Sequence, residues 1–152
     1  PAPQLDRFMV QVSIGFPDEG TEAEIISMHG RENAWKDFKP VIQHTELLQW
    51  QREVDNVEIH PDVIRYIVSC IRQTRNNPEV EICASPRAGI KVSRLARALA
   101  LVRGEPYVSI DLVKEIFVPS VAHRLVMQDT TQSVEEFLQH VLETVPVESR
   151  RS

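Results

Sequence analysis

Ser85, Pro86 and Arg87 have the types and the order that open a helix beside an anion. A serine hydroxyl accepts hydrogen bonds from the first free amides of a helix, and proline is favoured at the first helical position. Arg87 then falls in the first turn, where its charge opposes the positive end of the helix dipole. An anion such as a phosphate would offset this repulsion, because helix N-termini bind anions.

A basic stripe continues along the same predicted helix. Lys91 and Arg94 follow Arg87 at i+4 and i+7, which places the three side chains on one face. Two interpretations remain open, a solvated helix surface and an anion site at the helix start. The small residues Ala88 and Gly89 favour the anion site, because they let another surface approach the backbone closely.

A second candidate cation, Arg7, stands directly before a pattern typical of a half-buried strand. Apolar and polar residues alternate from Phe8 to Ile14. The pattern has no adjacent partner strand, so its partner is either a sheet in a missing part of the protein, a distant strand of this chain, or another chain. Arg7 either pairs locally with Asp6 or is offered to a neighbouring molecule.

Other chemistries have no support in the motifs. None of the five glycines lies in a GxxxxGK(S/T) frame, so these residues contain no phosphate-binding loop. HExxH and GxSxG motifs are absent and the five histidines are scattered, so we expect no metal site. The net charge of −5 argues against nucleic-acid binding, and no apolar run is long enough for a membrane span. Cys70 and Cys83 are interpreted as reduced thiols of a cytoplasmic protein.

The elements that position these residues are expected to be mainly helical. The chain has 152 residues, of which 42% are hydrophobic, and is large enough for one core. Apolar periodicity, capping residues and the positions of proline and glycine predict a bundle of five or six helices. With their caps, these cover about residues 21–30, 45–54, 61–76, 85–103, 109–119 and 133–146. Residues 57–59 and 122–127 are expected to form a short strand pair.

Taken together, the motifs resemble the MoxR family of AAA+ ATPases. The resemblance covers nearly the whole chain, although Cys83 stands where the family usually has glycine. The stretches that carry it are Pro3-Gln4-Leu5-Asp6-Arg7-Phe8, Ala84-Ser85-Pro86-Arg87-Ala88, Ala96-Arg97-Ala98-Leu99-Ala100, Arg103-Gly104, Tyr107-Val108 and His123-Arg124-Leu125.

The resemblance implies a fold and a domain division. The fold would be the mainly α helical bundle of an AAA+ lid domain, with at most a short strand pair and an N-terminal strand left over from the ATPase core. Residues 1–17 would be the end of that core and a linker, residues 18–148 the C-terminal helical lid, and residues 149–152 a frayed tail.

The resemblance also implies roles for four residues. Arg87 would be the sensor-2 arginine, which reaches the γ-phosphate of ATP bound in the core of the same subunit. Arg7 would be the arginine finger, which reaches the γ-phosphate held by the next subunit. Ser85 and Lys91 would assist Arg87 in binding the nucleotide. A guanidinium suits both arginine roles because it stays charged and binds phosphate through two parallel hydrogen bonds.

Cofactors and partners follow from the same resemblance. A full-length protein would use ATP and Mg²⁺, whereas this chain alone would bind neither tightly and would be inactive without a phosphate loop. Its partners would be its own N-terminal ATPase core, neighbouring subunits of a homo-oligomeric ring, and proteins with von Willebrand factor A domains. The function would be chaperone-like remodelling or activation of proteins in the cytoplasm.

Two other functions remain open on the residues alone. The chain could be a non-catalytic helical module that binds a protein through an apolar patch of Trp35, Phe38 and Trp50, although the same residues could pack in the core. It could also be a small DNA-binding domain that uses the helix of residues 87–103, which the acidic total disfavours.

Overall fold

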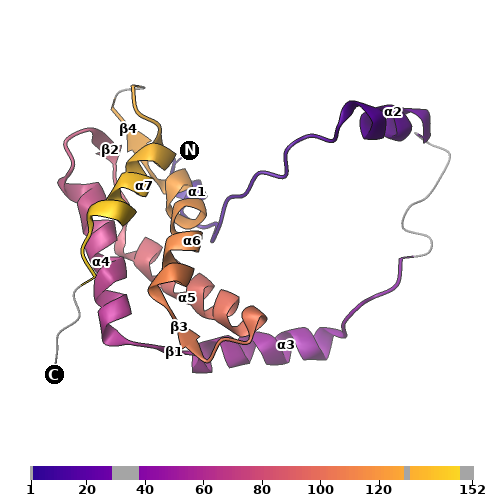
Figure 1. Ribbon diagram of the computed structural model, residues 1–152, viewed down its shortest axis with the longest axis horizontal. Coiled ribbons are helices and arrows are strands. Elements are labelled where there is room, and N and C mark those ends of the chain that lie inside the picture. The colour runs from indigo at the N-terminus through magenta and orange to yellow at the C-terminus, as the bar shows by residue number, and fades with distance from the viewer. Residues whose placement is uncertain (1, 29–37, 129–130, 148–152) are drawn as a thin grey trace.

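The computed structural model describes residues 2–28, 38–128 and 131–147, and these are mainly helical, as predicted. Figure 1 shows the arrangement of the elements. In chain order they are α1 (Ala2–Leu5), α2 (Glu19–Met28), α3 (His44–Glu53), the 3-10 helix η1 (Val54–Asn56), β1 (Glu58–Ile59), α4 (Pro61–Asn76), β2 (Val80–Ile82), α5 (Pro86–Arg103), β3 (Tyr107–Val108), α6 (Ile110–Val121), the 3-10 helix η2 (Ala122–Arg124), β4 (Val126–Met127) and α7 (Val134–Thr144).

The core lies where α5 packs against α6, with α4 and α7 beside them (Figure 1). α5 buries small side chains at every fourth position, namely Ala88, Val92, Ala96 and Ala100. This spacing keeps them on one face, and their small size lets the neighbouring helix approach closely. From α6, the large side chain of Phe117 fills the space beside them and is fully buried.

Two short sheets lie at opposite ends of α5. β1 pairs with β3 in parallel, with Ile59 opposite Val108, and β2 pairs with β4 antiparallel. The predicted pairing of residues 57–59 with 122–127 is therefore wrong. β3 follows α5 and pairs with β1 near the end of that helix. β2 precedes α5 and pairs with β4 at the other end (Figure 1).

Helix ends follow the predicted capping residues at several points. Gly104 ends α5 in the left-handed conformation, with φ of 69°. The hydroxyl of Ser109 accepts from the amide of Leu112 at the start of α6. Ser133 and Glu136 form the reciprocal capping box that opens α7. Local sequence therefore fixes these three boundaries.

Two predicted helix boundaries are wrong. Asp18, and not Thr21, caps α2, because its carboxylate accepts from both the amide and the hydroxyl of Thr21, at 3.0 and 2.9 Å. Pro119 lies inside α6 and does not end it, since the helix continues to Val121. A proline this close to a helix end removes only one of the last amide donors.

The predicted N-terminal strand at residues 8–14 does not form within the described chain. These residues run without a paired strand, and Ile14 is 99% exposed. They lead to α2, which stands well away from the helical body (Figure 1). An alternating pattern specifies which side of a strand is buried, but a strand also needs a partner to bond. The contacts of this segment with the body lie around Arg7 and at Phe8 and Gln11, where the chain donates or accepts single hydrogen bonds and forms no strand.

We expect opposite effects from alanine at two glycines. Gly104→Ala should lower the free energy of unfolding by about 1 kcal/mol, because a side chain disfavours the left-handed conformation. Gly89→Ala should raise it by about 0.5–1 kcal/mol, because alanine is the better helix former. At Gly89 an added Cβ would lie 3.9 Å from Ile67, which is ordinary contact. Urea unfolding of both variants measures the difference, and equal shifts in one direction would contradict it.

Candidate functional site

The backbone directly before α5 is held by two side chains of α4. The buried hydroxyl of Thr74 accepts from the amide of Ala84 at 3.2 Å and donates to the carbonyl of Ile71 at 2.8 Å. Arg75 donates through Nε to the carbonyl of Ala84 at 2.9 Å. Both backbone polar groups of Ala84 are therefore bound, which fixes the point from which α5 begins.

Ser85 occupies the predicted N-cap position but does not cap with its side chain. Its backbone is extended, with φ of −75° and ψ of 165°, as at other N-caps. The amide of Ala88, which a capping hydroxyl would bind, donates instead to the carbonyl of Ser85 at 3.0 Å. The Oγ of Ser85 is buried and has no hydrogen-bond partner among the described residues. The predicted side-chain cap is therefore wrong, and this hydroxyl is left with an unused donor.

The basic stripe on α5 divides into free and bound side chains. Arg87 and Arg94 are exposed, and within the described ranges neither makes a hydrogen bond or an ion pair. Lys91, one turn after Arg87, is half-buried and donates through Nζ to the carbonyl of Arg7 at 2.9 Å. Arg87 thus remains available to an external anion, whereas Lys91 binds the N-terminal segment.

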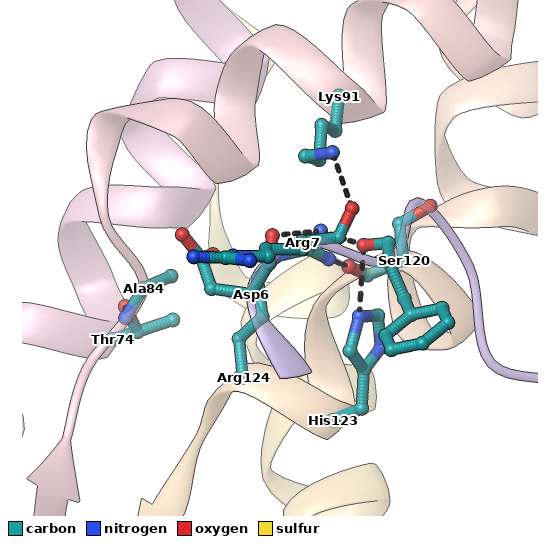
Figure 2. Close-up of polar contacts among 9 residues, drawn as sticks. Asp6, Arg7, Thr74, Ala84, Lys91, Ser120, His123 and Arg124 are labelled. Atoms are coloured by element: carbon teal, nitrogen blue, oxygen red, sulfur yellow. Dashed lines mark hydrogen bonds and ion pairs between the residues drawn. The ribbon is translucent and has the colours of Figure 1, made fainter. Parts of the chain in front are cut away.

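Arg124 is the most buried cation of the site, with a side chain that is 2% exposed. Its Nε donates to the carboxylate of Asp6 at 2.9 Å, and its Nη1 donates to the carbonyl of Ser120. Its Nη2 donates to the carbonyl of Phe8 and, at 3.3 Å, to that of Asp6 (Figure 2). Asp6 therefore pairs with Arg124 and not with Arg7, so the predicted alternative of a local Asp6–Arg7 pair is wrong.

His123 adds a second donor to the carbonyl of Phe8. Its Nε2 lies 3.3 Å from that oxygen, and because a carbonyl only accepts, Nε2 carries the hydrogen. Burial lowers the pKa of His123, and the charge of Arg124 lowers it further against the opposing effect of the Phe8 carbonyl. The ring is therefore neutral near pH 7, with its buried Nδ1 unprotonated.

The outcome of these contacts is that the backbone around Arg7 is bound while its side chain is not. Arg7 is exposed, and no other residue in the described part of the chain forms a hydrogen bond or ion pair with its guanidinium. Figure 2 shows Lys91, His123 and Arg124 converging on this backbone.

The sequence predicted Arg7 as a site residue, but no local signal pairs Asp6 with an arginine 118 residues away. The motif at residues 123–125 was visible only as part of the family resemblance.

A groove of about 470 Å³ lies between α5, α4 and η1, and Arg94 is one of the residues that line it. Exposed apolar side chains line it, including Ile64, Val68 and Ile90. Arg97 also lines it and donates to the carbonyl of Asp55 at 3.0 Å. The groove is open and carries no acidic or metal-binding cluster, and no group of three or more metal-ligating side chains occurs within the described ranges.

Two of the three aromatic residues predicted as a patch, Phe38 and Trp50, are not in the core. Trp50 on α3 is 45% exposed and Phe38 is 68% exposed, while Trp35 lies outside the described residues. α2 and α3 contain no buried residue at all. These elements therefore present apolar surface outward.

In the same described ranges, no helix has both the length and the apolar character that crossing a membrane requires.

Comparison with known proteins shows which family the helical body resembles. Residues 72–143 match the AAA lid domain. The chain is 32% identical to the chaperone MoxR1 of Mycobacterium tuberculosis over 136 residues, which are 84% of this chain and 36% of MoxR1. It is 28% identical to the uncharacterized protein YeaC of Bacillus subtilis, over 100% of this chain and 49% of YeaC. The chain thus spans about half of the length of YeaC and about a third of the length of MoxR1.

A solved structure has the same fold. The crystal structure of a Cytophaga hutchinsonii protein named "putative ATPase" superposes with a TM-score of 0.83 at 22% identity. The match covers 98% of this chain and 49% of that one. Because nearly the whole chain is included, the likeness extends to the segment that leaves the helical body.

Thr74→Val tests whether α4 sets the start of α5. Valine keeps the shape of threonine but leaves the buried amide of Ala84 without an acceptor, so stability should fall by about 1–3 kcal/mol. Thr74→Ser keeps the hydroxyl and should cost less than the valine variant. Chemical denaturation measures both. A loss in Thr74→Ser as large as that in Thr74→Val would contradict this role of the hydrogen bond, because only the valine variant lacks the hydroxyl.

Proposed function

Because this chain is a MoxR-like AAA+ sequence that carries an AAA lid domain, we propose that it senses ATP through Arg87 and presents Arg7 to a neighbouring subunit of a ring. The observation that carries the proposal is the state of Arg87. It is an exposed guanidinium without a partner in the described chain, in the first turn of a helix whose start is fixed from α4.

The chemistry at the start of α5 fits a terminal phosphate. Arg87 faces the positive end of the helix dipole without an acidic neighbour to balance it, so an external anion would be stabilised by both the charge and the helix end. The hydroxyl of Ser85 has no partner but is buried, so it offers no direct contact to an external phosphate in this structure. We assign the nucleotide contact to Arg87. We assign to Lys91 the role of holding Arg7, whose carbonyl it already binds.

The phosphate loop and the Mg²⁺-binding carboxylates would be supplied by an ATPase core. Phosphoryl transfer depends on positioning the phosphates and on neutralising charge, which a loop, a magnesium ion and arginines provide together. The 152 residues contain no such loop, so we expect no ATP hydrolysis by this chain alone. The chain spans 49% of YeaC and 36% of MoxR1, which leaves room for a core in relatives of that length.

The outward apolar surfaces suit the partners of such a domain. α2 and α3 expose side chains such as Ile26 and Trp50, which a core or an adjacent subunit would cover. MoxR1 is named a chaperone, and by this likeness we propose chaperone-like remodelling of partner proteins in the cytoplasm. Proteins with von Willebrand factor A domains are the client class that we propose to test first.

One alternative function has an observation of its own. A helical module that binds a protein without ATP would also expose apolar side chains on α3, and the groove between α4 and α5 would add to that surface. This alternative gives Arg87 no role. DNA binding is less well supported, because Lys91 and Arg124 donate to the chain's own carbonyls and the net charge is −5.

Two alanine variants in a full-length protein test the arginine roles. Arg87→Ala and Arg7→Ala should each lower kcat by about 10²-fold or more, since each removes a charge from the transferring phosphate. Arg94→Ala, which removes an exposed arginine two turns further along α5, serves as the control and should leave kcat within about twofold. Wild-type turnover in both test variants would refute the assignment.

Mixing the two variants tests the division between subunits. An Arg7→Ala subunit keeps its own site, and an Arg87→Ala subunit keeps the arginine that it offers to its neighbour. A random 1:1 ring should therefore recover about one quarter of wild-type turnover, since about one interface in four combines the two intact halves. If both arginines served the same subunit's site, mixing would recover nothing.

A further inference from the structure

The segment around Arg7 is attached to the helical body almost entirely through its backbone. Lys91 binds the carbonyl of Arg7 at 2.9 Å, and His123 and Arg124 bind that of Phe8. Further along, the amide of Gln11 donates to the carbonyl of Pro119 at 2.9 Å. The side chain of Asp6 is the one exception among these contacts, through its ion pair with Arg124. Attachment of this kind fixes the path of the chain and leaves the intervening side chain free.

Arg124 needs this segment as much as the segment needs Arg124. A guanidinium has five N–H donors and no alternative neutral form, so a buried one must find acceptors. Only the carbonyl of Ser120 comes from its own helical region. The other acceptors are the carboxylate and carbonyl of Asp6 and the carbonyl of Phe8. Release of the segment would remove all of these partners except the carbonyl of Ser120, so the attachment is favoured by an ion pair and by charge-assisted hydrogen bonds.

Lys91 links this attachment to the start of α5. It lies one turn after Arg87 on the same continuous helix, and its Nζ reaches the peptide of Arg7 itself. A helix moves as a rigid unit over one turn, so a displacement of α5 at Arg87 would also displace the group that binds Arg7. The helix end and the exposed guanidinium of Arg7 are thus connected through one side chain.

We propose that Lys91, His123 and Arg124 form a clamp that positions Arg7 and makes its position follow that of α5. The clamp residues are positioning residues, because they bind the backbone beside Arg7 and touch no nucleotide. The inference rests on the proposed function, since it assigns to the clamp the delivery of Arg7 to the neighbouring subunit. In this arrangement a nucleotide bound at Arg87 influences the arginine that the same subunit offers to the next site.

Trypsin measures the clamp itself, independently of any ATPase activity. Trypsin cleaves after an exposed arginine, but it must draw the scissile carbonyl into its oxyanion hole, and the Arg7 carbonyl is held by Lys91. Cleavage between Arg7 and Phe8 of the full-length protein should therefore be slow. Lys91→Met should speed it about tenfold, the effect of losing one charge-assisted hydrogen bond. Arg124→Lys, which cannot form the forked bonds, should speed it at least as much.

Matched controls separate the clamp from general loosening. Lys114→Met is the control for Lys91→Met, at an exposed lysine on α6. Arg103→Lys is the control for Arg124→Lys, at the exposed arginine that pairs with Glu115. Neither control should change cleavage after Arg7. Mass spectrometry of the peptide that begins at Phe8 gives the rate. A wild-type rate as fast as that of Lys91→Met would overturn the clamp.

Mixed rings then test what the clamp does. A Lys91→Met subunit should behave like an Arg7→Ala subunit: its own turnover is low, it is rescued by mixing with Arg87→Ala, and it is not rescued by mixing with Arg7→Ala. A lid damaged in its own site would show the reverse pattern. Rescue by Arg7→Ala, or unchanged turnover of Lys91→Met alone, would overturn the positioning role even if trypsin confirmed the clamp. Failure of Arg7→Ala and Arg87→Ala to rescue each other would instead refute the proposed function.

Discussion

The buried guanidinium of Arg124 is the constraint on which the site depends. Its side chain is 2% exposed, so its donors are satisfied by protein acceptors or not at all. Asp6 and Phe8 supply most of these acceptors from the other end of the sequence. The need to pair one charge therefore brings the first residues of the chain onto η2 and the end of α6. Without it, the segment before α2 would be held to this surface by single hydrogen bonds, such as that from Lys91 to the carbonyl of Arg7.

α5 connects the two arginines of interest. Its start is fixed by Thr74 and Arg75 through the peptide of Ala84, so Arg87 projects from a defined point. One turn later, Lys91 binds the peptide of Arg7. The small side chains on the buried face of α5 pack it closely against α6, which carries the chain on to Arg124. Both exposed guanidinium groups are consequently supported by the same pair of helices.

Local sequence determined the helical elements well, because helix signals act within a few residues. The positions of α3 to α7 follow from apolar spacing and from caps such as Ser109, Ser133 and Gly104. The predictions that failed concern longer range. Alternation at residues 8–14 indicated a strand, yet a strand forms only with a partner. The pairing of β1 with β3 depends on where α5 returns the chain, which no local pattern contains.

For the candidate site, the sequence by itself determined which arginines to consider and where Arg87 lies on its helix. It also carried the family resemblance, which the AAA lid match and the relatives support. Only the tertiary structure decided that Asp6 pairs with Arg124, that Lys91 binds Arg7, and that the hydroxyl of Ser85 is unused. The physical reason is that hydrogen bonds between residues more than 80 positions apart depend on packing, whereas helix starts depend on neighbouring residues.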